Sequence, residues 1–147
     1  MKTKKSLVFK KFCVSYGVDP DEVPQILSFE DACRATGNNP EAMPVVTGIN
    51  ERHQKRIVAD YKLSIIAEAL REGKDVDYNG NSAKYFAVFE VEADEKRPSG
   101  FGLSCDVYDC WFTYSTVGVR LCFHNLNVVK FFGKHFIELH KDHHLYT

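Results

Sequence analysis

The sequence predicts an α+β domain in which an antiparallel β-meander of three to four strands packs against a long central helix and a C-terminal helix. Two observations carry this prediction. Apolar residues recur at helical spacing over residues 50–72 and again over residues 126–143, and between these segments they alternate at the two-residue period of a strand. The length of 147 residues fits a single domain over residues 1–147.

Residues 1–26 are expected to form an arm and a connector. Residues 5–16, KSLVFKKFCVSY, have the composition of either one strand broken by Lys10 and Lys11 or a frayed arm. The following GVDPDEVPQ contains two prolines and shows no periodicity, which indicates a connector.

Residues 28–73 are the predicted helical part. Ser28 begins a helix, because its hydroxyl can accept a hydrogen bond from an orphan backbone N–H while Asp31 reaches back to the cap. Gly37 ends this helix, since glycine tolerates the left-handed conformation that follows many helices.

The main helix is expected to be capped by Asn50, to run to Glu72 and to stop at Gly73. At 1.5 Å per residue it is about 34 Å long, enough to cross a small domain. Its apolar residues recur every four positions and form one wide stripe, with further apolar residues beside it. The stripe comprises Ile57, Tyr61, Ile65 and Ala69, flanked by Leu63, Ile66 and Leu70.

The stretch DVDYNGNS, residues 75–82, has the order of residues found in the first half of a calcium loop. An EF-hand loop also needs a bidentate glutamate at its last position, where this chain has Phe86. The favoured interpretation is a turn from helix to strand, built by Asp75, Asn79 and Gly80. A calcium site of another type is the alternative.

Residues 84–124 carry the predicted β-meander. In KYFAVFEVE, Tyr85, Ala87, Phe89 and Val91 share one face, which is the alternation of a strand. After the polar turn ADEKRPSG come three more β-prone pieces, FGLSCDVYDC, WFTYST and VGVRLCF.

Residues 126–143 form the predicted C-terminal helix. Gly133 within it costs about 1 kcal/mol relative to alanine. A close contact between this helix and the sheet at Gly133 would account for that cost. The apolar stripe of the helix comprises Val129, Phe132, Phe136 and Leu139.

The net charge of −1 provides no overall field that would attract nucleic acid or an anionic membrane. The charge is uneven, however, because residues 1–11 hold five lysines and no acid. These lysines can neutralise phosphates and strand aromatics can stack bases, so nucleic-acid binding is an alternative function. The lysines concerned are Lys2, Lys4, Lys5, Lys10 and Lys11.

Five cysteines at irregular spacing, with no secretory leader before them, indicate free thiols in a reducing compartment. No run approaches 18 apolar residues, so no membrane span is expected. These features predict a cytoplasmic protein.

Three of the cysteines and one histidine supply the ligand types of a structural zinc site: Cys105, Cys110, Cys122 and His124. Four residues separate Cys105 from Cys110, which on a β segment holds the two sulfurs apart unless a turn intervenes. Buried cysteines acting as small apolar residues are therefore favoured, with zinc as the alternative. No other cofactor is expected.

The chain ends in the histidine-rich HFIELHKDHHLY. His140 and His144 can share one helix face, and His135, Glu138 and Asp142 can lie together on one side. A solvated helix end is the favoured interpretation, because histidines suit the negative C-terminal end of a helix. The H-E-x-x-H arrangement of zinc hydrolases is absent from the sequence.

Catalysis would require a cysteine, Cys110 or Cys122, to be paired with His124 or His53. A nucleophile of this kind needs a positioned base, which the sequence does not reveal. The nucleotide-binding G-x-G-x-x-G, the Walker loop and G-x-S-x-G are also absent. The sequence therefore favours a non-enzymatic function and assigns no catalytic residue.

Arg120 faces away from its apolar neighbours on the last predicted strand, and Asp106 and Asp109 lie in the neighbouring piece. A cross-strand ion pair is the favoured interpretation. If this face is a groove, four residues would instead form a polar and aromatic patch that binds a partner. They are Arg120, Asp109, Trp111 and Tyr108.

Two stretches of the sequence are distinctive when taken together. The first is SFEDACRATGNNPEAMP followed by RIVADYKLSIIAEALREGK. The second runs from FEVEA through SGFGLSCDVYDCWFTYSTVGVRLCF to a helix with FGKHF. In this order they resemble a group of small proteins encoded in tailed-phage and prophage genomes of gut bacteria. The resemblance covers roughly residues 27–142 and departs from the pattern at Val119, where serine is expected.

This resemblance implies group membership and carries no established activity, cofactor or catalytic residue. Small phage proteins of this kind usually act by binding to a host protein, to their own virion or replication machinery, or to nucleic acid. We therefore expect a non-enzymatic phage accessory protein, in the host cytoplasm or on the virion, whose partner is a host or phage protein. Nucleic-acid binding and a structural zinc role are the alternatives.

Overall fold

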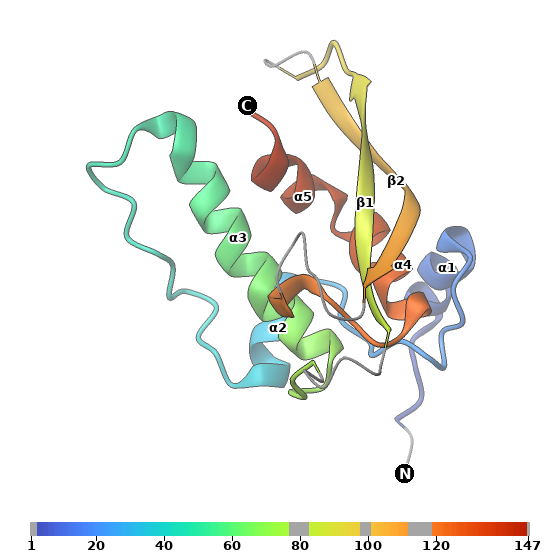
Figure 1. Ribbon diagram of the computed structural model, residues 1–147. Coiled ribbons are helices and arrows are strands. Elements are labelled where there is room, and N and C mark those ends of the chain that lie inside the picture. The colour runs from blue at the N-terminus through green and yellow to red at the C-terminus, as the bar shows by residue number, and fades with distance from the viewer. Residues whose placement is uncertain (1–2, 77–82, 98–100, 112–118, 147) are drawn as a thin grey trace.

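Figure 1 shows the computed structural model, which describes residues 3–76, 83–97, 101–111 and 119–146. Side chains are described throughout these ranges except at residues 101, 106–111 and 119. The elements in chain order are α1 (Leu7–Tyr16), α2 (Phe29–Thr36), α3 (Glu51–Leu70), β1 (Lys84–Ala93), β2 (Phe101–Trp111), the 3-10 helix η1 (Val119–Leu121), α4 (Leu126–His135) and α5 (Ile137–His144). Among the described residues, no helix combines the length and apolar composition that a membrane span requires.

The two strands form a hairpin on one side of the molecule, and α3 runs along the other side with α5 between them (Figure 1). α4 contacts both strands and α1, whereas α5 contacts α3 and β2. α2 packs on α3. This arrangement confirms the predicted α+β class and the packing of helices against antiparallel strands.

The described strands form a two-stranded antiparallel hairpin, so the predicted meander of three to four strands is not confirmed. The strands pair from Lys84 opposite Trp111 to Ala93 opposite Phe101, with a bulge between Val88 and Glu90. The piece WFTYST lies outside the described residues after its first position.

Within the described residues 119–123, the last β-prone piece, VGVRLCF, forms the 3-10 turn Val119–Leu121, and Phe123 pairs with β1 through an isolated bridge to Tyr85. Arg71 provides the physical reason, because its guanidinium donates to the carbonyl of Arg120 at 2.7 Å and to that of Cys122 at 3.3 Å. A strand would need these carbonyls for ladder hydrogen bonds.

The predicted arm at residues 5–16 is wrong, because this segment is the helix α1. Ser6 caps the helix by accepting a hydrogen bond from the Phe9 N–H, and Gly17 ends it in the left-handed conformation, with φ of 69°. Phe9 and Cys13, four residues apart, are fully buried. The lysines that suggested a broken strand lie on the exposed side of this helix.

α1 packs on α4 through aromatic contacts. The rings of Phe9 and Phe131 lie 5.5 Å apart between centroids. The Tyr16 hydroxyl lies 2.8 Å from His135 Nδ1, and His135 Nε2 lies 2.8 Å from the carbonyl oxygen of Leu27. His135 therefore joins α1, the segment before α2, and α4.

The caps predicted for α2 are confirmed. The Ser28 hydroxyl accepts from the Asp31 N–H at 3.1 Å, and Gly37 adopts the left-handed conformation with φ of 74°. The Asp31 carboxylate reaches one residue further back than expected, since it accepts from the Leu27 N–H at 3.0 Å.

Asn50 caps α3 as predicted, accepting from the Arg52 N–H at 3.0 Å. The helix ends at Leu70 rather than Glu72, because Glu72 takes a left-handed φ of 55° before Gly73. The predicted stripe is buried in the second half of the helix, whereas Ile57 and Tyr61 in the first half are partly buried.

The predicted single helix at residues 126–143 is two helices, separated at Phe136, whose φ is −102° and ψ is 30°. Phe136 is buried among the rings of Phe131 and Phe132, so its packing accompanies the change of direction. The close helix–sheet contact at Gly133 is confirmed, because a Cβ added there would overlap Cys105 Sγ and lie 3.1 Å from Ala87 Cβ.

Candidate functional site

The predicted partner-binding patch is only partly described. Arg120 is exposed, and the side chains of Tyr108, Asp109 and Trp111 lie outside the described residues. The backbone places Trp111 opposite Lys84, at the end of the hairpin where Phe123 bridges to β1. The patch and its ion-pair alternative stay predictions.

The predicted zinc ligands lie in different surroundings where they are described. Cys105 is buried against Gly133, and Cys122 is buried with Val76 and Phe86. His124 is exposed, with Nδ1 3.0 Å from the carbonyl oxygen of Ala83. The described side chains contain no cluster of three or more metal-ligating residues, and the side chain of Cys110 is outside them.

The calcium alternative rests mainly on residues 77–82, which lie outside the described residues. Asp75, the first residue of the proposed loop, is described and is exposed at the edge of a groove. The turn and calcium interpretations therefore stay predictions.

The prediction of a solvated, histidine-rich helix end is wrong for His140, which is 2 % exposed, whereas His144 nearer the end of the helix is exposed. His140 Nε2 lies 3.2 Å from the Phe132 carbonyl oxygen, while its Nδ1 is buried without a partner among the described atoms. Burial lowers the pKa of His140 to about 3. The exposed His144 has a pKa lowered to about 4 by partial desolvation and by the nearby His143 and Arg56. These two histidines stack on the same face of α5, as their spacing predicts.

The predicted grouping of His135 with Glu138 and Asp142 is also wrong. His135 belongs to α4, whereas Glu138 and Asp142 both contact the guanidinium of Arg97 after β1, at 3.2 and 3.3 Å. His143 on the same helix lies 3.2 Å from Asp60 on α3. The C-terminal helix is thus a packed connection between α3 and the hairpin.

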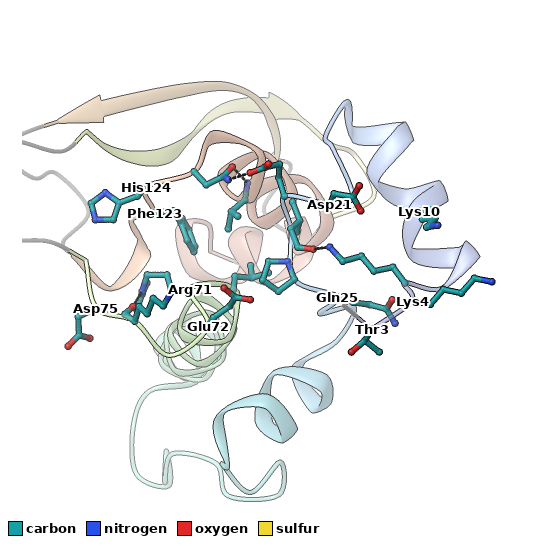
Figure 2. Close-up of a pocket in the computed structure, with 18 residues that line it drawn as sticks. Thr3, Lys4, Lys10, Asp21, Gln25, Arg71, Glu72, Asp75, Phe123 and His124 are labelled. Atoms are coloured by element: carbon teal, nitrogen blue, oxygen red, sulfur yellow. Dashed lines mark hydrogen bonds between the residues drawn. The ribbon is translucent and has the colours of Figure 1, made fainter. Parts of the chain in front are cut away.

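The described surface carries a groove of about 1180 Å³ (Figure 2). It is formed by the N-terminal segment, the connector before α2, the end of α3 and the segment that leads into α4. The residues that line it are Thr3, Lys4, Lys5, Lys10, Asp21, Glu22, Val23, Pro24, Gln25, Leu70, Arg71, Glu72, Lys74, Asp75, Phe123, His124, Asn125 and Val128. We call it the terminal groove.

The base of the terminal groove is apolar, because four of its lining residues are nearly fully buried: Val23, Leu70, Phe123 and Val128. Its rims are charged. Figure 2 shows Lys4 and Gln25 on one side and Arg71, Asp75 and His124 on the other. An apolar centre with a polar rim is the usual anatomy of a binding interface.

Lys5 ties the N-terminal segment to the connector. Its ammonium donates to the carbonyl oxygen of Val23 at 2.6 Å and to that of Pro20, and it lies 5.5 Å from the centre of the Phe9 ring. Its neighbours in the same rim, Lys4, Lys10 and Gln25, are exposed. Lys5 is therefore a structural cation of the groove, whereas Lys4 and Lys10 are exposed to solvent.

Arg71 and Asn125 order the opposite rim. Arg71 donates to the carbonyls of Arg120 in η1 and of Cys122 after it, and from Nε to the Lys74 carbonyl at 3.2 Å. Asn125 caps α4 through Oδ1 and donates from Nδ2 to the Glu22 carboxylate at 2.8 Å. The groove is therefore held in shape by hydrogen bonds between segments far apart in the chain, a feature for which no local sequence signal exists.

Replacing Lys5 by methionine is expected to lower the free energy of unfolding by about 1.5–3 kcal/mol, because hydrogen bonds from a charged donor to the Pro20 and Val23 carbonyls are lost. Lys4→Met at the exposed neighbouring position is the matched control and should change stability by less than about 0.5 kcal/mol. Urea unfolding followed by circular dichroism measures both. Equal stabilities for the two variants would contradict the structural role of Lys5.

Comparisons of the chain with protein-family models, with curated protein sequences and with solved structures found no match.

Proposed function

We propose that this chain is a non-enzymatic phage accessory protein that binds a host or phage protein, with the terminal groove receiving a segment of that partner. The groove, with its buried apolar base and charged rims, is the observation that carries the proposal. Its volume of about 1180 Å³ exceeds the range of roughly 300–1,000 Å³ common for small-molecule pockets. A peptide segment or protein loop suits a site of this size.

The positions of the titratable groups support binding over catalysis. Perturbed pKa values tend to gather at catalytic sites. The described groups whose pKa is shifted all lie away from the lining of the groove. They are Cys13, Tyr16, Cys33, His135, His140, His143 and His144.

A protein partner is favoured over nucleic acid by the charges of the groove. Lys5 is committed to backbone carbonyls, and Lys2 lies outside the described residues. The remaining cations of the lining alternate with Asp21, Glu22, Glu72 and Asp75, which would repel phosphates. A mixed rim instead suits the mixed charges of a protein surface. Residence in the host cytoplasm or on the virion is part of the same proposal.

The test is an affinity capture from lysates of bacterial host cells, with and without phage infection. Three forms of the protein are compared: the native chain, the groove variant Lys4→Glu with Lys74→Glu, and the control Lys96→Glu in the hairpin turn. All three lysines are exposed, so the variants should fold. We expect one reproducible protein to bind the native chain and the control, and to be lost or weakened at least about tenfold by the groove variant.

The captured protein is then purified and its affinity measured directly by calorimetry. Equal affinity for the native chain and the groove variant would refute the assignment to the groove. A reproducible nucleic acid in place of a protein would overturn the proposed partner class, and recovery of no partner would count against the binding function itself.

A further inference from the structure

Helix α1 is apolar on both of its faces. Its inward residues Phe9 and Cys13 are fully buried. Its outward residues Leu7, Val8 and Val14 are 68 %, 58 % and 76 % exposed. Three large aliphatic side chains exposed on one short helix give its outward face the character of a surface that a partner covers.

The outward face also has a defined pattern of charge. Leu7 and Val14 are seven residues apart and therefore lie almost in line along the helix. Lys10 and Lys11, three and four residues after Leu7, fall on either side of that line. Both lysines are exposed, and no acidic residue occurs in residues 1–18. The face is thus an aliphatic line between two cations.

Of four possible occupants, three fit this pattern poorly. A second copy of the chain in a symmetric pair would bring the same lysines together, which is unfavourable. An anionic bilayer would require a wide apolar stripe, whereas Lys11 lies between Leu7 and Val8 around this short helix. Nucleic acid would leave Leu7 and Val14 against phosphates. A protein surface that is both acidic and aliphatic complements the cations and the aliphatic line together.

We propose that the outward face of α1 is a second docking surface, which adjoins the terminal groove at Lys10, for an acidic protein segment with large aliphatic side chains. The carboxylates of this segment pair with Lys10 and Lys11. Its aliphatic side chains cover Leu7 and Val14. Because Lys4 and Lys10 also line the groove, the residues that test this surface alone are Leu7, Val14 and Lys11.

The experiment is a selection from a library of random short peptides displayed on a carrier, with the full chain as bait. The selected peptides are expected to carry net negative charge and at least two large aliphatic residues. Their affinity, measured by fluorescence anisotropy, should fall at least about tenfold for Leu7→Ser with Val14→Ser, and also for Lys11→Glu. Val45→Ser, at an exposed valine in the loop before α3, is the apolar control and should bind as the native chain does.

Each other outcome overturns the proposal. The proposal is wrong if the selected peptides are neutral or basic, or if no peptide is enriched. It is also wrong if the peptides bind the α1 variants with native affinity. Stronger binding of duplex DNA or of phosphatidylglycerol vesicles, each lost with Lys11→Glu, would reassign the surface to nucleic acid or to a membrane. The groove variant Lys4→Glu with Lys74→Glu should retain most of the peptide affinity, so failure of this surface and failure of the groove are distinguishable.

Discussion

Lowering the pH from 7 to 5 is expected to reduce the free energy of unfolding by about 2 kcal/mol through His140 alone. Burial lowers the pKa of His140 to about 3, whereas an unfolded histidine titrates near 6.5. Between these values the unfolded chain binds a proton that the folded chain excludes. The stabilising contribution is therefore complete above pH 6.5 and is lost as the pH falls, at about 1.4 kcal/mol per pH unit.

The groups that face His140 reinforce this direction. Phe89 on β1 and Phe132 on α4 surround its ring and offer no anion. His143 and His144 on α5 oppose its protonation, and their own pKa values are lowered by burial as well. The four histidines with lowered pKa values, His135 included, all act in the same sense.

The measurement is urea unfolding at pH 7 and pH 5 for the native chain, His140→Phe and the control His53→Gln, whose histidine is exposed. Stability should depend on pH less steeply in His140→Phe than in the native chain, by about one bound proton, and this loss should not occur in the control. An unchanged pH dependence in His140→Phe would refute the assignment to His140.

Gly133→Ala is expected to destabilise the fold by about 1–3 kcal/mol, although alanine is the better helix former by about 1 kcal/mol. The added Cβ would overlap Cys105 Sγ on β2 and press against Ala87 on β1, so α4 and the hairpin must separate. Both strands meet α4 at this point, and the loss should therefore appear in the cooperative unfolding of the whole domain.

The double variant Gly133→Ala with Cys105→Ala separates this mechanism from a general effect on the helix. Removing the sulfur creates the space that the new methyl group needs, so the double variant should be more stable than the sum of the single changes predicts, by at least about 0.5 kcal/mol. Urea unfolding measures the stability of each variant from its midpoint, provided that the dependence of the unfolding free energy on urea concentration is the same in all of them. If the effects of the two single changes simply add in the double variant, the contact with the Cys105 sulfur is not the cause of the destabilisation by Gly133→Ala.

Features encoded by neighbouring residues were predictable from the sequence. Ser28, Gly37 and Asn50 act through hydrogen bonds or backbone conformations within a few residues, and the structure has them as predicted. The cost of Gly133 in a helix likewise pointed to the contact with the hairpin. Helix α1 was missed although Ser6 and Gly17 are local caps, because its apolar residues surround the helix and leave no clear period.

Features that depend on distant residues could not be predicted in this way. The last β-prone piece has strand propensity, yet Arg71, some fifty residues earlier, binds two of its carbonyls. The terminal groove needs Lys5, Arg71 and Asn125 to meet from three parts of the chain. His140 has the polarity of a surface residue, and only the packing of Phe89 and Phe132 around it makes it a buried one.

The contact between Tyr16 and His135 has a consequence for the order of events during synthesis. The two residues are 119 positions apart, so α1 leaves the ribosome long before α4 exists. Until then Phe9 and Cys13 lack the surface that buries them, and the N-terminal helix is exposed to chaperones and proteases on all sides. A nascent chain arrested before residue 126 should therefore be cleaved near α1, and the released full chain should resist cleavage there.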